Sequence, residues 1–137
     1  MVKEETQQKY MELQHLNQQV KQSQDQLEAL QQQIIELTAV NQNLDEFKKV
    51  KIDKDVLVQI NNGIFAKASI KDNKNLIVNV GSEVAVKKDI PSTKKLIQEQ
   101  IDEIKKLQQK KLVELQDVVL RINILEKEIA EALEKKE

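Results

Sequence analysis

The fold of this chain is decided by residues 56–89, which read VLVQINNGIFAKASIKDNKNLIVNVGSEVAVKKD. The stretch opens with the short apolar run 56–60, and the turn Asn61-Asn62-Gly63 follows it. Residues 64–70 come next, and their second half alternates between small apolar and polar side chains. An Asn-Gly turn between two such runs is typical of a tight β-hairpin. The first half of the stretch therefore predicts a β-hairpin.

The second half of the stretch repeats this plan. A polar loop at 71–75 leads into the apolar run 76–80, and a further run at 84–86 follows the turn Gly81-Ser82. Strand-length apolar runs on either side of a glycine turn indicate a second hairpin. We therefore predict two consecutive hairpins.

Four short strands without a covering helix cannot hide both of their faces. An isolated hairpin is at best marginally stable in water, and open strand edges pair readily with other chains. The sequence therefore predicts obligate oligomerisation through this region. The expected contacts are its apolar side chains, namely Val56, Leu57, Val58, Ile60, Ile64, Phe65, Ile77, Val78, Val80, Val84 and Val86.

Two long helical segments flank the hairpins. In the first, residues from Leu13 to Leu44 follow one another at alternating spacings of three and four, which is an unbroken heptad pattern. No Gly or Pro interrupts residues 1–62. In the second, a heptad pattern runs from Ile97 to Ala132, and Ser92 is the expected N-cap. Both segments have the composition of long helices that share a narrow apolar seam.

Helices of matched length joined by a connector predict an intramolecular antiparallel coiled coil. The expected fold class is α+β, with a coiled-coil helix at 1–49, two β-hairpins for oligomerisation at 50–90 and a second coiled-coil helix at 91–137. Matching the chain about the middle of the connector places Leu13 near Ile129. With so few seam residues buried per turn, the helix pair is expected to be marginal and to fray at its ends, because ordering each backbone residue costs about 1–2 kcal/mol.

Asn41, Gln108 and Lys111 are polar residues at seam positions, and each allows two interpretations. Asn41 either fixes the register of the helices or points to water near the base of the coil. Gln108 and Lys111 either weaken the coil so that it flexes or are a tolerated irregularity. At these two positions we expect the seam to turn locally toward the flanking Leu107 and Leu112.

The composition excludes several classes of function. The formal net charge is −1, and aromatic residues make up only 2% of the chain, so the sequence favours neither nucleic-acid nor acidic-membrane partners. Cysteine is absent, which excludes disulfides and thiolate chemistry. No apolar run reaches transmembrane length and no signal-peptide core is present, so the expected location is the cytoplasm.

The sequence also carries no sign of catalysis. The single histidine, His15, falls on the polar face of the first helix, and acidic pairs such as Glu4-Glu5 are typical of a solvated surface. Gly63 and Gly81 are isolated turn glycines, so no phosphate-binding loop is present. We therefore expect no enzyme activity, no cofactor and no metal site.

A helix, two hairpins and a second helix of matched length resemble the plan of alpha-class prefoldin subunits of the archaeal type. The resemblance spans essentially the whole chain and is most specific in the hairpins, which are similar to LVP-x-G-x-G-x-F followed by V-x-VG-x-G. The matching residues are Val56-Leu57-Val58, Gly63, Phe65, Lys67-Ala68, Val78-Asn79-Val80-Gly81 and Val84-Ala85-Val86-Lys87-Lys88-Asp89. Gln59, Asn61 and Glu83 depart from this pattern, and a non-Gly residue at 83 disfavours a positive φ in the second turn.

The resemblance implies an ATP-independent chaperone subunit. It implies a hexamer of two alpha-class and four beta-class subunits, whose hairpins form a β-barrel platform, and delivery of clients to a group II chaperonin. Unfolded polypeptides would be held at the coil tips, where the apolar candidates are Tyr10, Met11, Leu13, Ile129 and Leu133. For Leu13 and Ile129, a place in the seam is the stronger expectation in the free protein. The alternatives are a homo-oligomeric or filamentous alpha-like prefoldin, or a purely structural coiled-coil scaffold.

Overall fold

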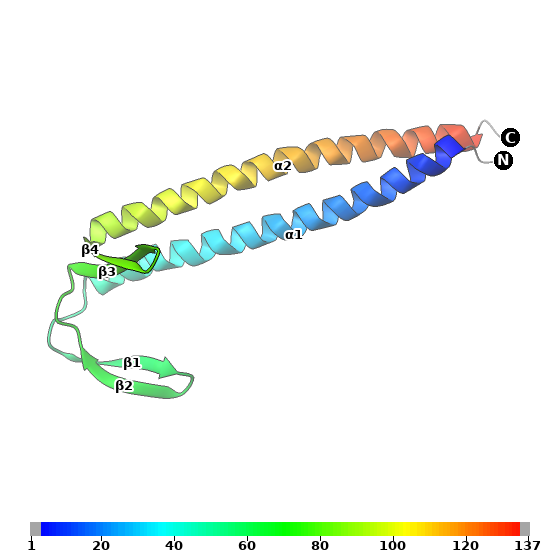
Figure 1. The fold of residues 1–137 in the computed structure, drawn as a ribbon. Coiled ribbons are helices and arrows are strands. Elements are labelled where there is room, and N and C mark those ends of the chain that lie inside the picture. Colours follow the sequence, from blue (N-terminus) through cyan, green and yellow to red (C-terminus); the bar gives the residue numbers. More distant parts are fainter. Residues whose placement is uncertain (1–3, 135–137) are drawn as a thin grey trace. The chain divides into compact units, whose positions relative to one another are not determined.

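The computed structural model describes residues 4–134 and consists of two long helices separated by four strands (Figure 1). In chain order these are α1 (Glu4–Phe47), β1 (Asp55–Asn61), β2 (Ile64–Ser69), β3 (Asn75–Gly81), β4 (Val84–Asp89) and α2 (Ile90–Glu134). The expected helices and hairpins are thus confirmed. The chain divides into two compact units, a helical unit of Met1–Ile34 with Glu103–Glu137 and a hairpin unit of Ile35–Asp102.

In the helical unit, the α1 and α2 segments pack along the predicted apolar seam. Ile122, Leu125 and Ile129 of α2 are buried, with exposures of 8%, 0% and 5%. On α1 the heptad positions from Leu13 to Leu30 are half-buried and Ile34 is buried, while the residues between them are exposed. Burial therefore follows the three-four spacing of the sequence, as a coiled-coil seam requires.

Polar contacts show the antiparallel register of this unit. Lys9 lies 3.3 Å from Glu128, and Glu12 contacts Arg121. These pairs show that the α2 residues opposite Leu13 come several positions before Ile129 in the sequence. The expected proximity of Leu13 and Ile129 is therefore wrong. The reason is that α1 ends at Phe47 and α2 begins at Ile90, both earlier than the sequence indicated. The shared midpoint moves back by about two residues, which displaces each opposite partner by about one helical turn.

The seam does not turn toward Leu107 and Leu112. These leucines remain 44% and 39% exposed, whereas Gln108 and Lys111 keep their seam positions and are half-buried. Each of these two polar side chains donates a hydrogen bond to a side-chain amide oxygen on α1. The Nε2 of Gln108 donates to Oε1 of Gln31 at 2.8 Å, and the Nζ of Lys111 donates to Oε1 of Gln26 at 2.9 Å. Because both polar groups are satisfied across the seam, the helix has no need to rotate.

Replacing this polar segment of the seam is expected to stabilise the helical unit. Gln108→Ile with Lys111→Leu puts apolar side chains at two half-buried positions, and each should add about 1 kcal/mol, since full burial of such a side chain contributes about 1.5–3 kcal/mol. Thermal unfolding followed by circular dichroism measures the change. Lys110→Leu, at an exposed neighbouring position, is the matched control and should have little effect. An equal gain from the control would show that helix propensity, and not seam burial, is the cause.

In the hairpin unit, the helix ends pack through Ile90, Ile97 and Ile101, whose exposures are 1%, 8% and 3%. Asn41 lies in this contact and does not point to water. Its Nδ2 donates a long bond of 3.5 Å to the carbonyl of Lys94, and its buried Oδ1 has no partner within the described residues. A buried acceptor without a partner costs about 1–3 kcal/mol.

The N-cap of α2 is Asp89 and not Ser92. Its Oδ1 accepts a hydrogen bond of 2.8 Å from the backbone amide of Ser92, and the hydroxyl of Thr93 donates to its carbonyl oxygen at 2.8 Å. Ser92 is therefore the third helical residue, and Pro91 occupies the first turn, where its missing amide hydrogen is tolerated. Bonds from the hydroxyl and the amide of Ser92 hold the pKa of Asp89 below its usual value.

A second aspartate orders the loop between the hairpins. The amide of Lys74 and the side chain of Asn75 donate to Asp72, which lowers the pKa of that carboxyl. Both folded pKa values lie below the unfolded ones, so the stabilisation is present above the unfolded pKa of about 4 and is lost as pH falls through the folded pKa.

We therefore expect the hairpin unit to lose stability below about pH 4. Asp89→Asn should flatten part of this loss, because an amide oxygen still caps the helix but does not titrate in this range. Thermal unfolding at a series of pH values tests this. Asp25→Asn, on an exposed part of α1, is the control and should leave the pH profile unchanged. A profile of Asp89→Asn that coincides with that of the parent chain would contradict the role of the cap.

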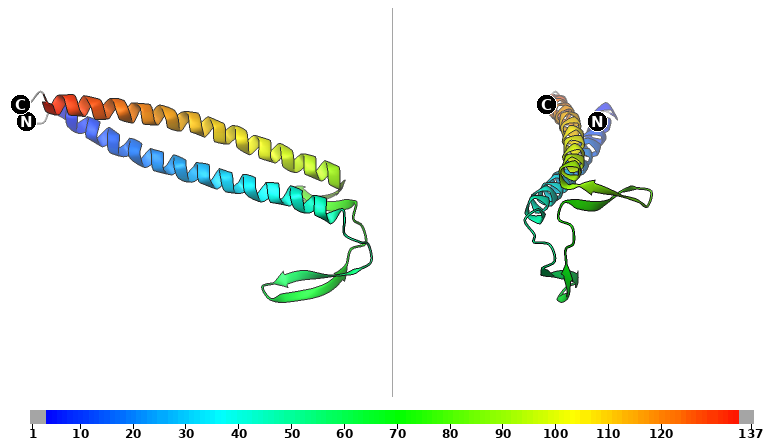
Figure 2. Two further views of the ribbon diagram at one scale, coloured as in Figure 1. Left: turned by 180° about the vertical axis from the view of Figure 1, so that it is seen from behind. Right: turned by 90° about the vertical axis from the view of Figure 1, so that its left-hand side faces the viewer.

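The four strands form two separate two-stranded antiparallel sheets, β1-β2 and β3-β4 (Figure 2). Their registers are the same at an offset of twenty residues: Val58 pairs with Ala66 and Val78 with Val86, and a bulge lies just before each turn. The aligned segments 55–70 and 75–90 share Val, Lys and Ile at equivalent positions. The hairpins are thus two copies of one pattern, alike in strand register as well as in the plan of their sequences.

The two turns differ in backbone conformation. In the first, Gly63 has a φ of 77°, which glycine adopts without strain. In the second, Ser82 and Glu83 have φ of 51° and 61°, the condition of a type I′ turn. Ser and Glu disfavour this left-handed region. Because Glu83 nevertheless has a positive φ, the second turn carries local backbone strain.

Candidate assembly and binding surfaces

The hairpins carry a large apolar surface that no other part of residues 4–134 covers. Leu57, Ile60 and Ile77 are 68%, 68% and 73% exposed. Val58, Ile64, Phe65, Val80 and Val84 are also exposed. Of the residues predicted for assembly, only Val56, Val78 and Val86 are half-buried. Isolated exposed apolar residues are normal, but an apolar surface concentrated on two small sheets marks an interaction site.

Both faces of the first hairpin carry apolar side chains. Val58 lies opposite Ala66 on one face, while Leu57 and Phe65 lie on the other, beside Lys67 and Gln59 respectively. A two-stranded sheet also has two free edges, because each strand is hydrogen-bonded on one side only. Faces and edges together suit the addition of strands from other chains.

The linker between the hairpins is tied to the end of α1 by Asn73. Its Nδ2 donates to the carbonyl oxygens of Lys48 at 3.4 Å and of Val50 at 2.9 Å. The amide of Ile90 also donates to the carbonyl of Lys74 at 3.1 Å. Asn73 was not singled out from the sequence, since a loop asparagine has no signal of its own. These bonds tie the linker to the residues that follow α1 and to the first residue of α2.

The distal end of the helical unit carries the second candidate surface. Tyr10, Met11 and Leu133 are exposed by 42%, 70% and 44%. Ile129 is buried in the seam and Leu13 is half-buried at a seam position. Of the five residues proposed for the tip, three therefore lie free for contact, while the other two hold the helices together.

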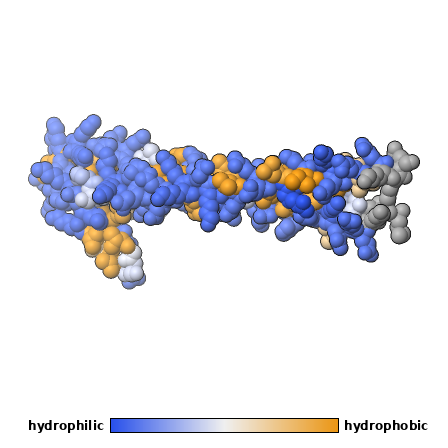
Figure 3. All heavy atoms as spheres, turned by 90° about the horizontal axis from the view of Figure 1, so that it is seen from above, coloured by the Kyte–Doolittle hydropathy of each residue, from blue (hydrophilic) through white to orange (hydrophobic). Residues whose placement is uncertain are grey.

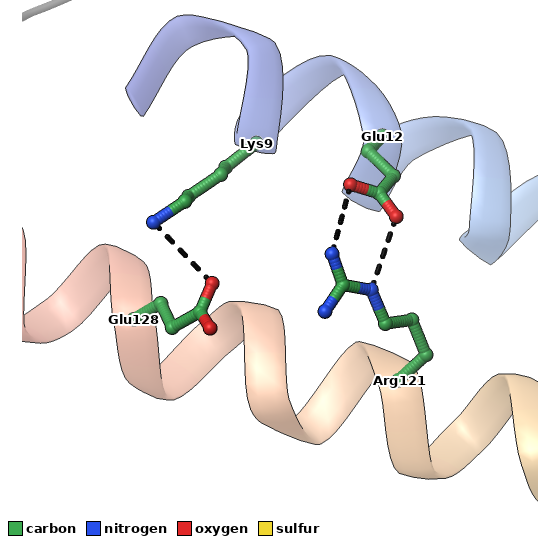
Figure 4. A network of polar contacts seen from close by, with 4 residues as sticks. All are labelled: Lys9, Glu12, Arg121 and Glu128. Carbon is green, nitrogen blue, oxygen red and sulfur yellow. Dashed lines mark hydrogen bonds and ion pairs between the residues drawn. The ribbon is translucent and has the colours of Figure 1, made fainter. Parts of the chain in front are cut away.

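Ion pairs close the helices at this end (Figure 4). The guanidinium of Arg121 donates from Nε to Oε1 of Glu12 at 3.1 Å and from Nη2 to Oε2 at 3.3 Å, a two-bond geometry that favours one orientation. The bond to Glu12 raises the pKa of Arg121. Lys9 and Glu128 pair further out, about one turn beyond Glu12 on α1 and two turns beyond Arg121 on α2. All four side chains are partly exposed to solvent, so the contacts orient the helices and contribute little to stability.

No arrangement of side chains for catalysis is found in the described residues. His15 is exposed. Within residues 4–134, no group of three His, Cys, Asp or Glu side chains is placed to hold a metal ion. None of the helices described is both long and apolar enough to cross a membrane.

The fold and these surfaces define a helical hairpin that carries two exposed β-hairpins, and residues 16–135 match the prefoldin family, described as prefoldin subunit. The chain therefore belongs to the prefoldin family, a family of chaperones. A comparison with curated proteins finds no significant match. Among solved structures, the chain is similar to filamentous PFD, an archaeal prefoldin from Methanocaldococcus jannaschii, with a TM-score of 0.77 and 16% sequence identity over 84% of this chain and 95% of that one.

Proposed function

We propose that this chain is an alpha-class prefoldin subunit that holds non-native polypeptides without ATP and passes them to a group II chaperonin in the cytoplasm. The observation that carries the proposal is the pair of uncovered apolar hairpins, because alpha-class subunits have two hairpins and beta-class subunits have one. In this proposal the hairpins assemble two alpha-class with four beta-class subunits into a β-barrel platform.

Client binding is assigned to the distal end of the helical unit. Tyr10, Met11 and Leu133 present apolar side chains there that the seam does not use. Methionine and other flexible apolar side chains suit partners of low specificity. Leu13 and Ile129 would join them only where the last turns of the helices separate.

A homo-oligomer or filament is the second candidate. It is favoured by the similarity to a prefoldin that is itself filamentous. The near-identical register of the two hairpins is compatible with it, since equivalent edges on one chain allow repeated addition of the same subunit. Sedimentation of the chain alone and with beta-class subunits distinguishes a filament from a hetero-hexamer.

Light scattering of a chemically unfolded enzyme, with and without the assembled protein, tests the function. A chaperone suppresses the scattering equally with and without ATP and magnesium, because the chain has no phosphate-binding loop. A purely structural scaffold leaves the scattering unchanged. Suppression that required ATP would contradict the proposal.

A further inference from the structure

The outward face of α2 carries an apolar stripe that the coiled coil does not use. Val113, Leu120 and Ile124 follow at spacings of seven and four, which places them on one side of the helix. They are 47%, 61% and 50% exposed, while Ile122 and Leu125 on the opposite side are buried. In Figure 3, hydrophobic atoms are visible along the side of the helical segment. Outward positions of a solvated coil are normally polar, so the apolar stripe indicates a binding surface.

The charges on either side of the stripe are opposite in sign. Residues 105–112 read KKLQQKKL, with four lysines and no acid, and residues 126–134 read EKEIAEALE, with four glutamates and one lysine. Several members of both blocks have exposed side chains that enter no ion pair among residues 4–134, namely Lys105, Lys106, Lys110, Glu126, Glu131 and Glu134. The two blocks lie at nearly equal distances from the middle of the stripe.

We propose that this stripe is a docking surface for the same stripe of a second copy of the chain, with the two α2 helices antiparallel. A two-fold axis near residues 118–119 brings Val113 of each copy opposite Ile124 of the other, and the two Leu120 side chains then lie three residues apart on either side of the axis, about 4.5 Å at roughly 1.5 Å per residue. The same operation sets each basic block against an acidic block, for example Lys106 against Glu131. Parallel copies would instead place lysines against lysines and glutamates against glutamates. The apolar and the charged patterns thus select the same arrangement.

The contact is small and is separate from the hairpins. Few apolar side chains are available on each copy, so the buried surface falls below the roughly 800 Å² per partner of a stable interface. Asp117 borders the stripe near the two-fold axis and would lie opposite Leu120 of the other copy, which weakens the contact further. Docking is therefore reversible, and its occupancy rises where several such contacts act together between two assemblies.

Disulfide trapping tests the arrangement directly, because the chain contains no cysteine. Full-length Val113→Cys and Ile124→Cys chains are mixed under mild oxidation. Their mixed dimer should form at least about tenfold faster than the dimer from Glu114→Cys with Ile124→Cys, since a disulfide requires Cβ atoms about 3.5–4.5 Å apart. Glu114 is exposed and adjacent in sequence but lies on another side of α2, so it is the matched control. Trapping by Val113→Cys alone as fast as by the mixture would overturn the antiparallel arrangement.

Charge reversal supplies the second variant. In the Val113→Cys and Ile124→Cys background, Lys106→Glu should slow the trapping several-fold, and adding Glu131→Lys should restore the rate. Slower trapping with Lys106→Glu and Glu131→Lys together than with Lys106→Glu alone would overturn the pairing of the blocks.

Leu120→Ser is followed in parallel by trapping and by client light scattering. Loss of client protection with unchanged trapping would assign the stripe to clients and overturn the proposal, whereas the reverse supports it. Oligomer size measured on the same samples reports separately whether the hairpin platform has formed.

Discussion

Replacing Phe65 with Asp is expected to dissociate the assembly into monomers or aggregates. Phe65 is 55% exposed in the single chain and is expected to be buried against strands of neighbouring subunits. An aspartate there places an unpaired charge in a subunit contact, at a cost on the order of 3–5 kcal/mol per site. Because the same residue repeats in every copy of the chain, the costs accumulate over the oligomer. Analytical ultracentrifugation measures the loss of the large species.

Two variants are the controls for this experiment. Phe65→Leu keeps an apolar side chain of similar reach and should preserve the oligomer with modest destabilisation. Asn62→Asp adds the same charge at the exposed tip of the same hairpin and should have little effect. Helicity should also decrease in Phe65→Asp, because a marginal helix pair loses its anchor. An oligomer of unchanged size would show that the face of the first hairpin that carries Leu57 and Phe65 is not an assembly interface.

The hairpins and the seam were predictable from the sequence because both are encoded locally. A turn such as Asn61-Asn62-Gly63 specifies its hairpin within a few residues, and heptad spacing specifies which side of a helix is buried. Val58 and Val78 accordingly lie where the apolar runs placed them, on paired strands of separate hairpins.

The errors concern competition between alternatives that lie close together in sequence. Asp89 and Ser92 are both good N-cap residues three positions apart, and only the structure shows which one begins the helix. The length of α2 then changes which residues of α1 it faces. Gln108 illustrates a different cause, since the acceptor of its side-chain hydrogen bond is Gln31, seventy-seven residues away in sequence. Periodicity cannot report such a partner.

The candidate sites divide in the same way. Exposed apolar residues such as Phe65 and Met11 were found because they do not belong to any buried pattern. The outward stripe around Leu120 was not found, because on a helix rich in leucine and valine its residues resemble a broad seam. Only their exposure in the structure separates them from the residues that hold the helices together.

Removing the apolar side chains of the distal end is expected to abolish client holding while assembly persists. More than forty residues of chain separate Met11 from the first hairpin, and distant sites without shared partners contribute nearly independently. The point variant Tyr10→Ser, Met11→Ser, Leu133→Ser removes the exposed groups and leaves the seam from Leu13 to Ile129 intact. The oligomer should keep its size in sedimentation, whereas suppression of light scattering from an unfolded enzyme should fall close to that of buffer.

A deletion gives the stronger form of the same experiment. Removing residues 1–11 with 130–137 takes away these side chains and the Lys9–Glu128 pair but keeps the Glu12–Arg121 pair that orients the helices. It includes residues 1–3 and 135–137, which lie outside the described part of the chain. Substituting His15 by Ser, on the exposed face of α1, is the control and should leave holding unchanged. If both the triple variant and the deletion protect an unfolded enzyme as well as the parent chain does, clients do not bind at the distal end. Their contacts would then lie along the sides of the helices or on the hairpins, where Phe65→Leu and Leu120→Ser distinguish the two locations.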